Sequence, residues 1–162
     1  RLAICGVGTL ETELKTLAEN LHIQDSVAFL GWQSNVYKYM NAADIFVMSS
    51  LAEGQPNSLI EALICGCPCV SVDCDYGPRE ILENGKYGLL SKKITKEVEN
   101  PATDPLTDEE QDLYDKLELM LTNKELRDEF RRKSVEVYDK FDEKIIVKKY
   151  FDIFLDGVTK EM

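Results

Sequence analysis

The residue types best suited to chemistry gather in residues 49–62, directly after a short apolar run. Two carboxylates, Glu53 and Glu61, stand eight positions apart in this segment. A carboxylate accepts hydrogen bonds from sugar hydroxyls but is a poor neighbour for phosphate. The pair therefore suits a ligand that has hydroxyl-rich groups at both ends.

A helix is predicted to begin between the two glutamates. Pro56 fixes the entry into the helix, and Asn57 is expected to cap it. The N–H groups of Asn57, Ser58 and Leu59 would then be open at a helix end that carries partial positive charge, where a diphosphate binds well. Gly54 lets the backbone turn and approach a ligand closely. Phosphate in the middle and hydroxyl-rich rings at both ends describe a nucleotide sugar.

The elements that must position this segment alternate between strand and helix. Amphipathic helices are predicted at 10–21, 35–42, 56–65 and 78–82, and continuous apolar strands at 2–5, 26–30, 44–48, 69–72 and 87–90. This pattern predicts an α/β, Rossmann-like parallel sheet with helices on both faces. Ligands bind at the carboxyl ends of such strands, so chemistry is expected in the loops after Cys5, Leu30, Met48 and Val72.

The chain of 162 residues is long enough for one domain with a single core. Residues 1–91 are predicted to form the Rossmann-like nucleotide-sugar-binding core, and residues 92–107 a polar connector. Residues 108–162 are predicted to form C-terminal helices that pack on the same domain. Capping residues mark these helices: Thr107 with Glu110, then Asn123, then Asp142.

Composition excludes several classes of partner and places the protein in the cytoplasm. A net charge of -11 repels nucleic acid and anionic lipid, and no apolar run approaches the ~20 residues of a membrane-spanning helix. The N-terminus lacks the pattern of a signal peptide. The five cysteines are odd in number, and four of them lie within ten positions around Cys67, which fits packing in a reducing cytosol better than disulfides or a metal site.

Two ordered patterns resemble a known family. The first is E-G-x-P-N-x-x-x-E-A, beginning at Glu53, and the second is G-x-P-x-V-S-x-D-x-x-x-G-P-x-E-I-L, from Gly66 to Leu82. Both resemble the C-terminal, donor-binding domain of retaining glycosyltransferases of the GT-B fold, family 4 or glycosyl transferases group 1. The resemblance extends from about Leu2 to Leu90, and the helices after it match only in general character.

The resemblance implies a role for each matching position. Glu53 would position the donor sugar by accepting its hydroxyls, Glu61 would bind the ribose hydroxyls, and the loop around Gly31 would lie against the base. The sugar and the diphosphate would be held by the segment of Gly54, Gln55, Pro56, Asn57, Ser58 and Leu59. The reaction implied is transfer of a hexose or N-acetylhexosamine, with retention, from a UDP-linked donor to a glycan or lipid-linked acceptor in cell-surface polysaccharide synthesis.

The family is metal-independent, so neither metal nor another cofactor is expected. Asp73-Cys74-Asp75 imitates a D-x-D metal motif, but its context matches the metal-independent family. Gly6-Val7-Gly8 lacks the third glycine of a dinucleotide fingerprint and is interpreted as a tight turn beside the sugar site.

One departure from the family concerns the phosphate-binding cations. In the family, an Arg and a Lys that neutralise the diphosphate precede the point where this chain begins, and so does the acceptor-binding domain. The chain alone is therefore expected to be inactive. The acceptor, and any contact with the inner face of the membrane, would be bound through that other domain. The alternative is a stand-alone nucleotide- or sugar-binding module without turnover.

Overall fold

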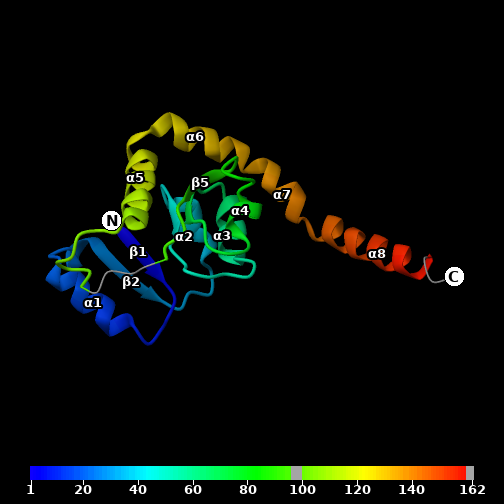
Figure 1. The fold of residues 1–162 in the computed structure, drawn as a ribbon. Coiled ribbons are helices and arrows are strands. Elements are labelled where there is room, and N and C mark those ends of the chain that lie inside the picture. The colour runs from blue at the N-terminus through cyan, green and yellow to red at the C-terminus, as the bar shows by residue number, and fades with distance from the viewer. Residues whose placement is uncertain (96–99, 160–162) are drawn as a thin grey trace.

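The computed structural model describes residues 1–95 and 100–159, with side chains to residue 155. Residues 96–99 of the predicted connector and 160–162 of the predicted tail lie outside the described residues. Within the described residues, five strands form two parallel sheets (Figure 1). One sheet pairs β1 with β2 and the other has the order β3-β4-β5; the strands are β1 (Leu2–Cys5), β2 (Val27–Gly31), β3 (Phe46–Met48), β4 (Cys69–Val72) and β5 (Gly88–Ser91). The α/β class is confirmed, but the expected sheet is divided into two.

Helices alternate with the strands as the periodicity predicts. Up to β5, the ends of the predicted helices and strands differ by at most two residues from those in the structure. They are α1 (Glu11–Asn20), η1, a 3₁₀ turn (Gln24–Ser26), α2 (Tyr37–Ala42), α3 (Asn57–Ile64) and α4 (Pro78–Ile81). Four more follow: α5 (Asp108–Thr122), α6 (Lys124–Lys133), α7 (Val135–Phe141) and α8 (Glu143–Thr159). The predicted caps mark one helix start, at Asn123, where the structure has two helices: α6 and α7 meet at Ser134, which is buried and whose hydroxyl donates to the Arg131 carbonyl at 2.7 Å.

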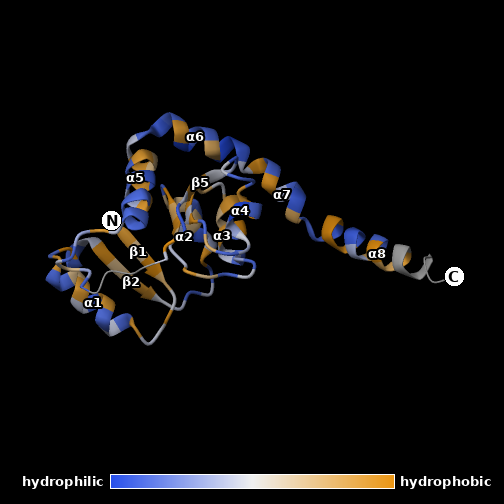
Figure 2. Cartoon of the chain, viewed as in Figure 1, coloured by the Kyte–Doolittle hydropathy of each residue, from blue (hydrophilic) through white to orange (hydrophobic). Residues whose placement is uncertain are grey.

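Buried side chains form two clusters, on opposite faces of the β3-β4-β5 sheet. Successive residues of a strand point to opposite faces, so Cys69 joins the cluster around Leu59 and Leu63 of α3, whereas Val70 packs with Met120 and Phe130 of α5 and α6. The expected single core is thus two clusters, one under each layer of helices. Figure 2 shows the strands of both sheets mostly in hydrophobic colours.

The sheet of β1 and β2 is far less covered. Leu2 of β1 and Leu10 and Leu14 at α1 are exposed, and Ala18 is the one residue of α1 that is fully buried. The continuous apolar character of these strands predicted burial on both faces. In the described structure α1 covers them only in part.

The C-terminal helices begin at the predicted caps. The Thr107 hydroxyl accepts the Glu110 amide at 3.2 Å while the Glu110 carboxylate accepts the Thr107 amide at 2.8 Å, and Asn123 accepts the Leu126 amide at 3.0 Å. Asp142 accepts the Lys144 amide at 2.9 Å. All three caps are therefore confirmed.

The last helix differs from the expectation that 108–162 packs on the domain. α8 extends away from the body beyond α7 (Figure 1), and its Tyr150, Phe151 and Phe154 are more than half exposed. In the described part of the chain, no helix is both long and apolar enough to cross a membrane.

Candidate functional site

The start of α3 is shaped by Pro56. This residue is the N-cap, with φ of -72° and ψ of 94°, and its carbonyl accepts the amides of Leu59 at 3.1 Å and Ile60 at 3.4 Å. Asn57 is already the first helical residue, and within the described chain no side chain caps this helix. The prediction that Asn57 caps α3 is wrong, because Pro56 already supplies the extended residue that precedes a helix.

The open amides at this helix start are those of Asn57 and Ser58. The first amides of a helix have no partner one turn before them, and both residues are exposed. Leu59 is different: its side chain is fully buried and its amide donates to Pro56. The prediction that the Leu59 N–H is open is therefore wrong, because the first turn of the helix uses it.

The loop after β4 lies beside the loop that leads to this helix. Ala52 forms a parallel β-bridge with Asp75, so the backbone pairing of β3 with β4 resumes beyond the strands. Further along, Gly77 faces the Gly54 carbonyl. The carboxyl ends of β3 and β4 thus bring residues 52–56 and 73–77 together.

Glu53 faces this second loop. Its carboxylate is partly buried, and its negative charge adds to burial in raising the pKa of the Cys74 thiol. Cys74 belongs to the loop after β4 and is itself buried. Glu53 therefore lies near the loop after β4, at the carboxyl end of the sheet.

Glu61 lies one turn into α3 and faces α2. The Tyr37 hydroxyl donates to Glu61 Oε1 at 3.3 Å, and the negative charge of Glu61 is the main cause of the raised pKa of Tyr37. The two glutamates thus have different neighbours, Glu53 the loop after β4 and Glu61 the helix α2. The start of α3 lies between them in the chain.

The loop after β2 is tied to the same helix α2. The Gly31 carbonyl accepts the Gly6 amide at 2.8 Å, and Gly31 itself has φ of +62°, a conformation that favours glycine. Gln33 donates to the Leu30 carbonyl at 2.6 Å and accepts the Tyr39 hydroxyl at 3.1 Å. A chain of contacts therefore runs from the Gly31 loop through α2 to Glu61.

Sequence reasoning missed the tyrosines of α2. The short segment Tyr37–Ala42 carries no recognisable motif, and neither Tyr37 nor Tyr39 has a partner close in sequence that would mark it. The only local sign is the Tyr-x-Tyr spacing on a helix between two predicted site loops.

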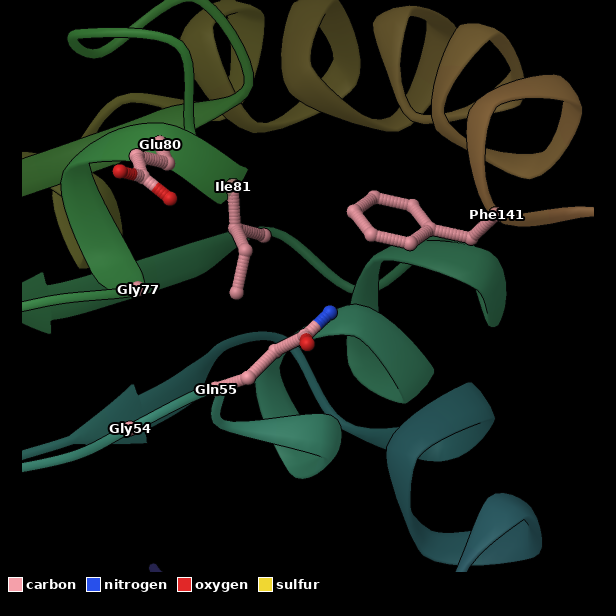
Figure 3. A pocket seen from close by; sticks show the side chains of 6 residues that line it. All are labelled: Gly54, Gln55, Gly77, Glu80, Ile81 and Phe141. Carbon is pink, nitrogen blue, oxygen red and sulfur yellow. The ribbon is translucent and has the colours of Figure 1, made fainter. Parts of the chain in front are cut away.

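A pocket of about 250 Å³ opens beside the loop of Gly54 and Gln55 (Figure 3). Its lining comes from three separate segments, namely Gly54, Gln55, Gly77, Glu80, Ile81 and Phe141. In the close-up the Gln55 side chain extends into the space between Ile81 and Phe141. The side chain of Gln55 thus points into this pocket, between α4 and α7.

The two carboxylates of the D-x-D imitation have separate cationic partners. Asp73 pairs with Arg79, and Asp75 pairs with Lys93, which follows β5. Among the described residues, no group of three or more His, Cys, Asp or Glu side chains is arranged to hold a metal ion. The crowded cysteines are packing residues: Cys67 and Cys69 are buried in the cluster around α3.

Comparison with known proteins shows the family of the chain. The model of the family described as glycosyl transferases group 1 matches residues 1–137. An uncharacterized glycosyltransferase of Methanocaldococcus jannaschii is 36% identical, over 93% of this chain and 40% of its own length. The Campylobacter jejuni N-acetylgalactosamine-N,N'-diacetylbacillosaminyl-diphospho-undecaprenol 4-alpha-N-acetylgalactosaminyltransferase is 34% identical, over 83% of this chain and 33% of its own.

Solved structures give the same answer for the fold. A variant of TarM from S. aureus, crystallised with fondaparinux, alpha-GlcNAc-glycerol and UDP, superposes with a TM-score of 0.74 at 26% identity. The match covers 94% of this chain and 28% of that one. This chain therefore spans 40% or less of the length of each of these relatives. With parallel sheets, flanking helices and a family match over most of its length, the chain belongs to the glycosyl transferases group 1 and has the fold of a C-terminal GT-B domain.

Proposed function

We propose that this chain binds the nucleotide-sugar donor of a retaining glycosyltransferase. The donor is a UDP-linked hexose or N-acetylhexosamine, and the acceptor is a glycan or lipid-linked glycan of a cell-surface polysaccharide. The observation that carries the proposal is the start of α3, where the amides of Asn57 and Ser58 are open. A carboxylate precedes this helix start and another follows it, and the neighbours of the two carboxylates lie in different elements.

Each part of the donor has a matching group. The open amides and the positive end of α3 accept the diphosphate, whose charge grows as the sugar leaves. Glu53 accepts hydroxyls of the sugar and positions it, and Glu61 accepts the ribose hydroxyls. The backbone around Gly31 lies against the base.

The printed names of relatives support the donor and acceptor classes. The Campylobacter jejuni relative is named for transfer of N-acetylgalactosamine to a diphospho-undecaprenol acceptor, and TarM was crystallised with UDP. We propose that no metal takes part, because Asp73 and Asp75 each pair with a cation of the chain and offer no joint ligand set.

Turnover of the full-length protein with a panel of nucleotide sugars tests the proposal. Glu53→Ala is expected to lower kcat on the order of 10²-fold, as loss of a transition-state contact does. Glu61→Ala is expected to raise KM for the donor about tenfold, the effect of lost hydrogen bonds to a charged group. The matched control is Glu125→Ala on α6, which is expected to keep parental rates. Parental rates in both site variants would refute the roles, and loss of activity with a chelator would refute metal independence.

A further inference from the structure

We infer that Tyr37 is a positioning residue for donor binding, which holds the Glu61 carboxylate in the orientation that accepts the ribose hydroxyls. This inference rests on the proposed function. It adds a residue from α2, an element to which neither the motifs nor the family resemblance assigns a role.

The hydrogen bond joins two separate elements, α2 and α3. The Tyr37 hydroxyl donates to Glu61 Oε1 at 3.3 Å across 24 positions of sequence. The hydrogen bond occupies one carboxylate oxygen on one side, whereas a carboxylate has about four acceptor sites on its two oxygens. Oε2 and the remaining lone pair of Oε1 are left for the two hydroxyls of a ribose.

Both ends of the hydrogen bond are anchored. On α3, the residues flanking Glu61 in sequence, Ile60 and Ala62, are buried in the cluster under the helix, so the helix cannot turn about its axis. On α2, the Tyr39 hydroxyl donates to Gln33 at 3.1 Å and ties the helix to the loop after Gly31. Tyr37 therefore lies on the element that connects the proposed base contact with the proposed ribose contact.

Packing does not explain a tyrosine at this position. The Tyr37 side chain is 51% exposed, whereas Tyr87, which does serve the core, is 0% exposed. A half-exposed ring contributes little to the core, so we attribute the role of Tyr37 to its hydroxyl and the hydrogen bond that it donates to Glu61. A tyrosine hydroxyl is protonated at neutral pH and so can donate, and the charge of Glu61 is the main cause that raises the pKa of Tyr37 further above that range.

The chain offers a closely matched control. Tyr114 of α5 is 49% exposed, and its hydroxyl donates to Glu118 Oε1 at 3.2 Å within the same helix. Chemistry, exposure and distance are thus nearly the same as for Tyr37 and Glu61. α5 contributes no residue to the proposed site.

The experiment measures the affinity of the full-length protein for UDP and for 2′,3′-dideoxy-UDP by calorimetry, with Tyr37→Phe, Tyr114→Phe and Glu61→Ala. Tyr37→Phe is expected to weaken UDP binding by about threefold to tenfold, the range of one hydrogen bond, with dideoxy-UDP affinity unchanged. In turnover the same variant is expected to raise donor KM at constant kcat. Tyr114→Phe is expected to match the parent in every assay, and circular dichroism checks that each variant is folded.

Two negative results have different meanings. If the parent prefers UDP over dideoxy-UDP and Glu61→Ala removes that preference, but Tyr37→Phe keeps it, the role of Tyr37 is refuted and the proposed function stands. If the parent does not distinguish the two nucleotides, the proposed ribose contact is refuted and the role of Tyr37 with it.

Discussion

Gly77 lies so close to Pro56 that a Cβ at Gly77 would overlap Cδ of the proline ring and stand 3.0 Å from the Gly54 carbonyl oxygen. Neither neighbour is the flexible end of a side chain, since one is the ring that fixes the entry to α3 and the other is backbone. Gly77 also has φ of +88°, which side chains rarely adopt. The loop after β4 therefore supports the start of α3 through a contact that only glycine allows.

Gly77→Ala is expected to lower the free energy of unfolding by about 2 kcal/mol or more, because left-handed backbone strain of roughly 1–2 kcal/mol adds to displacement of the Pro56 turn. Donor affinity is expected to fall as well, since the helix start moves. Urea denaturation and UDP titration measure the two effects.

The control for this substitution is Gly8→Ala. A Cβ at Gly8 has open space among the described residues, and Gly8 is not among the glycines with positive φ. Its effect on unfolding is expected to stay within about 0.5 kcal/mol. Equal destabilisation by both variants would show that the contact between Gly77 and Pro56 has no special importance.

A polar network joins α7 to the end of α4. Tyr87 has a buried ring, and its hydroxyl accepts from Lys86 and Lys140 at 2.8 Å each and donates to Glu136 at 3.0 Å. Lys140 also pairs with Glu83. The hydrogen bonds from Lys86 and Tyr87 lower the pKa of Glu136 below its ordinary value.

Glu136→Gln is expected to lower the urea midpoint at neutral pH. A carboxyl group with a lowered folded-state pKa adds stability that is present above its unfolded pKa and is lost as the pH falls through the folded value. The difference between parent and variant should therefore be largest near pH 7 and disappear in acid.

Glu129→Gln is the matched control for Glu136→Gln. The pKa of Glu129 is also lowered, by Lys133, but this pair is an i,i+4 pair within α6 and joins no separate elements, and such pairs contribute little. A pH-independent difference for Glu136→Gln, or an equal effect of both variants, would contradict the role of the network.

The cysteines are expected to differ in how fast a thiol reagent modifies them. Cys5 is exposed, whereas burial raises the pKa of Cys67 to about 11 and that of Cys69 well above its ordinary value. Since the thiolate is the reactive form, a disulfide reagent at pH 8 should modify Cys5 quickly and Cys67 and Cys69 only on unfolding. Mass mapping of the labelled sites checks this, with Cys5→Ser as control. Rapid labelling of Cys67 in the native protein would contradict it.

Features that depend on neighbours in sequence could be predicted from the sequence. Interactions within a few residues determine the strand and helix periods. The same holds for the Thr107 capping box and for the caps at Asn123 and Asp142. The same is true of the placement of Glu53 and Glu61 before and after a helix start. The use of the Leu59 amide inside the first turn was local too, but the motif alone does not distinguish a cap at Pro56 from one at Asn57.

Only the tertiary structure decided which distant residues meet. Strand order and register decide four features of this structure. They bring Tyr37 to Glu61, Gly77 to Pro56 and Cys74 to Glu53, and they divide the strands into two sheets. Order and register are set by packing over the whole domain, so no local pattern encodes them. The sequence alone therefore predicted the fold class and the segment proposed to bind the donor. The three-dimensional packing determined which side chains surround it.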